Sequence, residues 1–350
     1  MVSPIKLKQI DKKKFRLLDS KIKKLIKLLN KKTKSHPYIV VMAMHELFRN
    51  LYPHDPYIKT EKDNFKRIST TVENLQHFVN SACKLGAYKN PSLYTKYDTQ
   101  DLFGSLWIER SNKKKLDSSS VLKELLERSG FKLKFFKNKK VLDIGCGSGR
   151  FTIAFAKLGV KLSVGVDLGD EGLKLGKLMA KKNKIKNIKF YKSNVLSLPF
   201  KNNSFDFVFC KGVLHHTGNT YQGLSELKRV LKKDSNAFIY LYGSDGIFWR
   251  TRRLMRKVMK KIPYDYSIKV LNTIGMPARR TIFVDSWYVP IEDHINQNTL
   301  EKWFKKNSLE FNKYKNAKKT ELEYMEKKEK YFKELFGNGE LRYVIKKCQS

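Results

Sequence analysis

Residues 141–150 read VLDIGCGSGR and decide the fold of this chain. The stretch predicts a short buried strand over 139–144, a glycine-rich turn and a helix over 151–158. Three glycines at alternate positions allow backbone amides to approach a ligand closely, and the N-terminus of the following helix carries partial positive charge at the same point. The sequence therefore predicts a nucleotide-type pocket at the carboxyl end of a parallel strand.

The spacing of these glycines differs from that of a dinucleotide-binding turn. A dinucleotide fingerprint needs glycine at its first, third and sixth positions, and the sixth position here is Arg150. Asp167 follows the next predicted strand, 162–166, where an acidic side chain can accept hydrogen bonds from both ribose hydroxyls of a nucleotide. The same carboxylate could instead cap the turn after the strand, so both interpretations stay open.

Strands and helices alternate from residue 139 onward, which predicts an α/β domain with a parallel sheet. The segment 205–210 is almost entirely apolar, as expected for a central strand. We expect a turn at 234–236 before the strand that follows. The predicted strands are 141–144, 162–166, 188–192, 205–210, 237–242, 309–314 and 340–346.

Residues 1–138 show helical periodicity and no strand alternation. Apolar side chains recur at three- and four-residue steps over 15–30, and further helices are predicted over 38–51, 69–84 and 118–129. We therefore expect a mainly helical N-terminal region, 1–138, which we interpret as a substrate cover, in front of an α/β domain over 139–350.

The regular pattern lapses over 243–298, which we expect to be an insertion that forms a lid over the acceptor of the reaction. It contains five aromatic residues that could line a pocket, and a predicted helix over 247–262 that is dense in Arg and Lys. This helix could bind an anionic acceptor, a phospholipid surface or RNA phosphates, or it could present a solvated face.

The formal net charge is +40, and basic residues outnumber acidic ones throughout the chain. Lys is about four times as frequent as Arg, whereas recognition of phosphates or bases favours Arg. The positive charge can therefore be interpreted either as a solvated Lys-rich surface or as a binding surface for RNA or a membrane. Four widely spaced cysteines suit a reducing compartment and show no metal-binding spacing. No signal pattern or transmembrane run is evident, so we expect a cytoplasmic protein.

The chain resembles the class I S-adenosylmethionine-dependent methyltransferases, in particular the small-molecule branch with the quinone and sterol (type 11) enzymes. The resemblance rests on 141–150, on Asp167, on 193–195 after the third strand, on 205–216 and on 225–233. It implies a Rossmann-like fold with a central, mostly parallel seven-stranded sheet and helices on both faces. It also implies S-adenosylmethionine as the cofactor and no metal.

The resemblance transfers cofactor contacts onto matching positions of this chain. Asn194 departs from the family pattern, because this position is usually acidic and binds the adenine amino group. Its amide oxygen can still accept from that amine, or it can form a local Asx turn. The cofactor-binding residues expected on this basis are Asp143, Gly145, Cys146, Gly147, Gly149, Asp167, Leu168, Asn194, Val195 and Lys211.

Methyl transfer from a sulfonium is an in-line displacement in which the protein mainly aligns the acceptor and, where needed, removes a proton. His215 and His216 follow the central strand and are the expected catalytic residues, with His216 favoured. Each could instead be a hydrogen-bonded structural histidine.

We interpret the chain as a methyltransferase that acts on a small-molecule or lipid-like acceptor. The basic residues would suit an anionic acceptor. An RNA methyltransferase that binds through the Lys-rich surface is the main alternative, and a non-catalytic binding protein with the same fold is another. Peripheral contact with a membrane is compatible with the basic helices.

Overall fold

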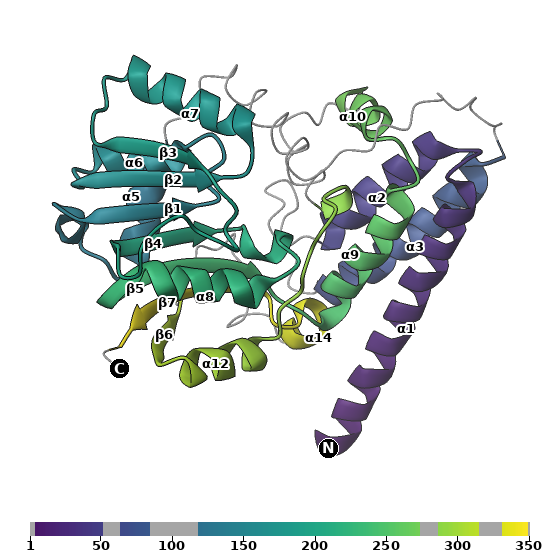
Figure 1. Cartoon of the computed structure of the whole chain (residues 1–350). Helices are drawn as coiled ribbons and strands as arrows, with labels where there is room; N and C mark the ends of the chain where they lie inside the picture. Colours follow the sequence, from purple (N-terminus) through teal and green to yellow (C-terminus); the bar gives the residue numbers. More distant parts are fainter. Residues whose placement is uncertain (1–3, 52–63, 85–117, 274–285, 315–330, 349–350) are drawn as a thin grey trace. The chain divides into compact units, whose positions relative to one another are not determined.

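The computed structural model describes residues 4–51, 64–84, 118–273, 286–314 and 331–348 (Figure 1). The chain divides into two compact units, each of which is assembled from separate stretches of sequence. The first unit contains residues 1–96, 245–288 and 319–337, and the second contains 97–244, 289–318 and 338–350. The expected lid, 243–298, thus contributes to both units, and its residues 274–285 lie outside the described part of the chain.

In the described part of the second unit, seven strands form one sheet in the order β3-β2-β1-β4-β5-β7-β6. Neighbouring strands from β3 to β5 are parallel, and β7 runs antiparallel to both β5 and β6. This arrangement confirms the mostly parallel seven-stranded sheet. The strands are β1 (Lys140–Ile144), β2 (Leu162–Asp167), β3 (Ile188–Lys192), β4 (Phe205–Lys211), β5 (Leu231–Tyr242), β6 (Leu309–Lys313) and β7 (Glu340–Lys347).

Helices cover both faces of this sheet (Figure 1). Leu224 and Leu227 of α8 and Phe304 of α12 pack into the core on one face. On the other face, Phe209 and Phe238 stack with ring centroids 5.3 Å apart beneath aromatic residues of α6. The covering helices are α5 (Ser119–Arg128), α6 (Arg150–Lys157), α7 (Asp170–Lys182), α8 (Thr220–Val230) and α12 (Gln297–Lys306), with short 3-10 helices at Leu133–Phe136 and Leu214–His216.

The strand order reverses direction between β1 and β4. The chain moves outward from β1 through β2 to β3, and then returns to place β4 on the other side of β1. Connections that leave the carboxyl ends of β1 and β4 therefore diverge, and such a switch point is where open α/β sheets bind ligands. The glycine-rich turn follows β1 at this place.

The predicted turn at 234–236 lies inside β5 as the structure bounds it. Leu231 pairs with Phe205, whereas Asn236 pairs with Phe207, so the register shifts between these two pairs. Asp234 has a φ of 54°, which places it in the left-handed region. The turn residues thus form an irregularity within the strand, and regular pairing resumes at Asn236.

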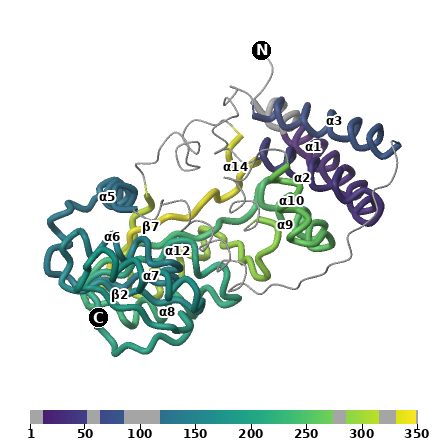
Figure 2. The backbone as a smooth tube through the Cα atoms, turned by 90° about the horizontal axis from the view of Figure 1, so that it is seen from above, coloured from purple at the N-terminus to yellow at the C-terminus, as the bar shows by residue number. Residues whose placement is uncertain are grey.

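The first unit is helical in its described part (Figure 2). The apolar face of α1 is buried as its spacing predicts, with Ile22, Leu25 and Leu29 fully inaccessible to solvent. Arg250 of α9 lies 3.5 Å from Asp19 of α1, so part of the expected lid packs on the N-terminal helices. The helices are α1 (Pro4–Lys32), α2 (Pro37–Leu51), α3 (Asn64–Ala82), α9 (Gly246–Met259), α10 (Tyr264–Thr273) and α14 (Phe332–Phe336).

Two of the aromatic residues expected to line a pocket belong to the interior of this helical unit. Trp249 and Trp287 are both buried, and the Tyr288 hydroxyl hydrogen-bonds Ser267 at 2.6 Å. Among the described helices, none is long and apolar enough to cross a membrane.

Candidate active site

The glycine-rich turn after β1 depends on backbone conformations that favour glycine. Gly145, Gly147 and Gly149 have φ values of 66°, 52° and 72°. A Cβ atom on Gly145 would lie 2.3 Å from the side chain of Val213, and one on Gly149 would lie 2.5 Å from the ring of Phe190. Neighbouring strands and their loops therefore pack directly against the turn.

Asp167 at the end of β2 stabilises this turn by hydrogen bonds. The Gly147 amide donates to Asp167 Oδ2 at 2.7 Å, and the Gly169 amide donates to Oδ1 at 2.9 Å. Burial raises the pKa of Asp167, while these amide hydrogen bonds lower it. Each carboxylate oxygen has a second lone pair, so Asp167 can cap its own turn and still accept a hydroxyl from a ligand.

Asp143 lies inside the unit, two residues before the turn. Its side chain is buried, and Oδ2 accepts a hydrogen bond of 2.7 Å from Thr152 Oγ1 on α6. Burial, together with the nearby carboxylate of Asp167, raises the pKa of Asp143 to about 7 against the opposing effects of Thr152 and Arg150. Asp143 therefore keeps its proton to a higher pH than an exposed aspartate does.

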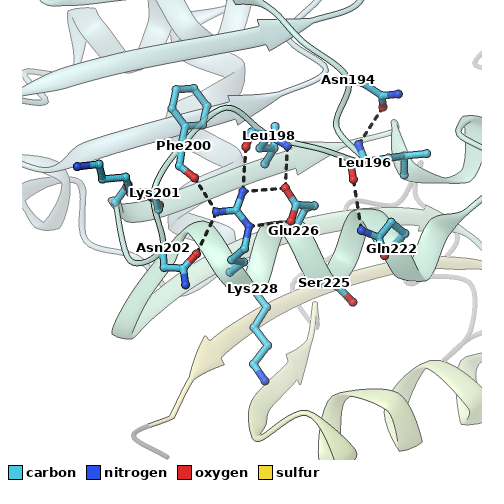
Figure 3. Close-up of polar contacts among 12 residues, drawn as sticks. Asn194, Leu196, Leu198, Phe200, Lys201, Asn202, Gln222, Ser225, Glu226 and Lys228 are labelled. Carbon is cyan, nitrogen blue, oxygen red and sulfur yellow. Dashed lines mark hydrogen bonds and ion pairs between the residues drawn. The ribbon is translucent and has the colours of Figure 1, made fainter.

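The loop after β3 carries Asn194 and Val195. The Leu196 amide donates to Asn194 Oδ1 at 2.9 Å, which is the Asx turn that the sequence left open (Figure 3). Asn194 is exposed and Val195 is buried, so the first presents its amide to solvent while the second anchors the loop. Leu168, after β2, is also exposed at 38%.

A Glu–Arg pair on α8 holds this loop in place. The Arg229 guanidinium donates to both carboxylate oxygens of Glu226, at 2.7 and 2.8 Å, and to the carbonyl oxygens of Leu198 and Phe200, at 2.9 and 2.6 Å. Glu226 in turn accepts from the Leu198 amide at 2.7 Å. Figure 3 shows these contacts joining the helix to the loop. The sequence analysis assigned neither residue a role, although their i, i+3 spacing places them on one face of a helix.

Lys211 ends β4, and its ammonium group lies near two aromatic rings. Lys211 Nζ is 5.4 Å from the ring centroid of Tyr240 and 5.8 Å from that of Phe151. Tyr240 pairs with Lys211 on one side and with Arg342 of β7 on the other, whose guanidinium lies 4.8 Å from the same ring. Two cations thus flank Tyr240 at the end of the central strands.

The two histidines after β4 have different environments. His215 is fully buried and stacks on Tyr242 with ring centroids 3.8 Å apart. His216 is partly exposed, and its Nδ1 lies 2.9 Å from the carbonyl oxygen of Ile291. The more accessible His216 is therefore better suited to meet a substrate.

The expected site residues gather at the carboxyl ends of four neighbouring strands, β1 to β4. Cys146 is buried, and burial raises the pKa of its thiol, which favours a packing role for the side chain. The roles of these residues in holding a ligand stay predictions. In the described residues, no group of three or more His, Cys, Asp or Glu side chains could hold a metal ion.

Comparison with known proteins shows which family this chain is similar to. The family described as "Methyltransferase domain" matches residues 135–278. The uncharacterized methyltransferase YcgJ of Bacillus subtilis is 35% identical over 95 residues, which cover 27% of this chain and 37% of that protein. Demethylmenaquinone methyltransferase of Geobacillus stearothermophilus is 37% identical over 98 residues, which cover 27% of this chain and 42% of the relative.

Residues 135–278 are thus similar to a methyltransferase domain, which agrees with the resemblance to the class I S-adenosylmethionine-dependent enzymes. The chain spans less than half the length of these two curated relatives. Among solved structures, PKMT2 from Rickettsia typhi in complex with AdoHcy has a TM-score of 0.48 and 18% identity, covering 64% of this chain and 52% of that one.

S-adenosylmethionine is the cofactor of this methyltransferase domain, and the geometry described above fits it. The glycine turn provides closely approachable backbone beside the Asp167 carboxylate, and Asn194 presents an exposed amide at the end of the next strand. We expect Asp167 to accept from the ribose hydroxyls of the cofactor and Asn194 from its adenine amine.

Asp167→Ala should weaken cofactor binding by about 10- to 100-fold, because it removes a charged acceptor for ribose hydroxyls and releases the Gly147 amide. Isothermal calorimetry with S-adenosylmethionine measures the affinity. Asp170→Ala is the matched control, since Asp170 is exposed at the start of α7 and pairs with Lys192. Equal affinities of both variants would contradict a cofactor role for Asp167.

Asp143→Asn should make stability less sensitive to pH. The pKa of folded Asp143 is about 7 rather than 3.8, so raising the pH through this window destabilises the wild type by up to about 4 kcal/mol. Urea unfolding of the cofactor-free protein at pH 5 and pH 8 should show the wild type losing stability relative to the variant. The same difference at both pH values would contradict a buried, protonated acid.

Arg229→Met should lower the free energy of unfolding by about 1–3 kcal/mol and weaken cofactor binding, because carbonyl oxygens of the loop after β3 lose their donor. Lys228→Met, on the same helix, removes an equal charge whose side chain points away from the loop (Figure 3). Urea unfolding and calorimetry test both variants. If the two behave alike, the effect comes from charge and not from the loop contacts.

Proposed function

We propose that the chain transfers a methyl group from S-adenosylmethionine to a small-molecule or lipid-like acceptor, with His216 as general base. The cofactor supplies a methyl group activated by a positively charged sulfur, so the protein has to align the acceptor and remove its proton. The observation that carries this proposal is the position of a partly exposed histidine in the loop after β4, beside the strand whose glycine turn we propose to bind the cofactor.

The ring of Tyr240 and its two flanking cations support an acceptor that combines a planar apolar part with negative charge. Lys211 and Arg342 lie 5.4 and 4.8 Å from this ring, and the Tyr240 hydroxyl donates to Glu340 at 2.7 Å. Arg342 also pairs with Glu340, so the group combines an aromatic ring, two cations and one carboxylate, and it suits a planar ring with a partly anionic substituent better than a neutral chain. The relative named as a demethylmenaquinone methyltransferase supports the ring, though not the negative charge, of such an acceptor.

The N-terminal helices and the segment after β5 are proposed to cover the acceptor. Asp19 of α1 contacts Arg250 of α9, and Asn30 of α1 accepts a hydrogen bond from Lys261, two residues beyond the end of α9, so these stretches pack together within the helical unit. A shared unit allows them to act together as one cover.

RNA as the acceptor is the second candidate, and the basic surface of α1 is the observation that favours it. Along this helix the exposed side chains are mostly cationic, while its apolar face is buried in the helical unit. A buried apolar face leaves only electrostatic attraction for an RNA or membrane surface.

Purified protein should transfer label from methyl-labelled S-adenosylmethionine into a small-molecule extract, as detected by mass spectrometry. His216→Gln should slow this transfer by about 100-fold or more if a base is required. His77→Gln is the control, because His77 is exposed on α3. Label that enters added RNA instead, with binding that falls steeply as salt rises, would replace the small-molecule proposal with the RNA alternative.

A further inference from the structure

We infer that residues 289–295, here named the strap, hold His216 in the tautomer whose basic nitrogen is Nε2. The inference rests on the proposed function in so far as His216 is the general base. It assigns Asp293 and Thr220 as positioning residues, which act on His216 through the backbone and not through contact with the substrate.

The contact between His216 and the strap determines which ring nitrogen carries the proton. His216 Nδ1 lies 2.9 Å from the carbonyl oxygen of Ile291. A carbonyl oxygen can only accept a hydrogen bond, so Nδ1 donates and carries the hydrogen. In the neutral ring, the lone pair that can take a proton from a substrate is then on Nε2.

Just beyond Ile291, the strap is hydrogen-bonded to the loop after β4 and to the end of β5. The Asp293 amide donates to the His215 carbonyl oxygen at 2.7 Å, and the Ile295 amide donates to the Tyr242 carbonyl oxygen at 3.0 Å. Gly243 and Ile295 also form a parallel bridge. The strap therefore runs along the loop that carries His216, with its backbone in a defined register.

Side chains of the strap reinforce this register. Thr220 Oγ1 lies 3.1 Å from Asp293 Oδ2 and 3.2 Å from the Leu214 carbonyl oxygen, so it joins the strap to the loop between Leu214 and α8. His294 Nε2 lies 2.7 Å from Glu292 Oε1, and both of these side chains are almost completely buried.

The consequence for catalysis is orientation of the base. An unrestrained neutral histidine populates mainly the Nε2–H tautomer, in which Nε2 cannot accept a proton. A carbonyl oxygen that accepts from Nδ1–H stabilises the other tautomer, so that Nε2 is basic in most of the neutral molecules. Orienting acceptors do the same for other catalytic histidines.

Long-range proton–nitrogen NMR correlations of the cofactor-free, full-length protein test the inference. Labelled histidine gives one pattern per ring, and His216→Gln identifies the His216 signals. At a pH above its titration, wild-type His216 should show the Nδ1–H pattern. Asp293→Ala and Thr220→Val should shift it toward the Nε2–H pattern, whereas Thr220→Ser, which keeps the hydroxyl, should retain the wild-type pattern.

Thr273→Val is the matched control, because Thr273 is exposed on α10. An Nε2–H pattern in the wild type would overturn the inference, and so would an unchanged pattern in both folded tether variants. These results would leave methyl transfer itself intact. Full activity of His216→Gln, in contrast, would overturn the general-base role even with the expected tautomer.

Discussion

The hydrogen bond between the Gly147 amide and the Asp167 carboxylate is the contact on which the rest of the site depends. It joins the turn after β1 to the end of β2, at 2.7 Å, and so holds two strand ends that a cofactor must span. The turn can form only because glycine occupies positions of positive φ, and Val213 and Phe190 pack where side chains would otherwise lie. The local folding of the turn and the cofactor binding that we propose for it thus depend on the same geometry.

Charge under the turn is regulated by burial. Asp143 and Asp167 are two acids close together in a poorly solvated place, and the raised pKa of Asp143 relieves their repulsion by retaining a proton near neutral pH. Thr152 and the backbone amides of the glycine turn stabilise the negative charge that remains. A cationic cofactor would meet this partial negative charge, which is consistent with the sulfonium of S-adenosylmethionine.

Two sets of hydrogen bonds fix the loops after β3 and β4, which are not held by pairing within the sheet. The Glu226–Arg229 pair fixes the loop that carries Asn194, and the strap fixes the histidine loop after β4. Both use side chains or amides that bind carbonyl oxygens of another segment. Rigid loops reduce the reorganisation that remains when substrates bind, which is how alignment contributes to rate.

Local pattern in the sequence was sufficient for the strand positions, the glycine turn and the methyltransferase family, because hydrophobic period and glycine spacing are written in adjacent residues. It also placed Asp167 at the end of β2 and His216 in the loop that follows β4. It did not reveal that Trp249 and Trp287 are interior residues of a helical unit, that 234–236 lies within β5, or that Arg229 and Ile291 support the site. These depend on the tertiary path of the chain, since a hydrogen bond to a backbone carbonyl is available at every residue and only the fold decides which carbonyl a side chain meets.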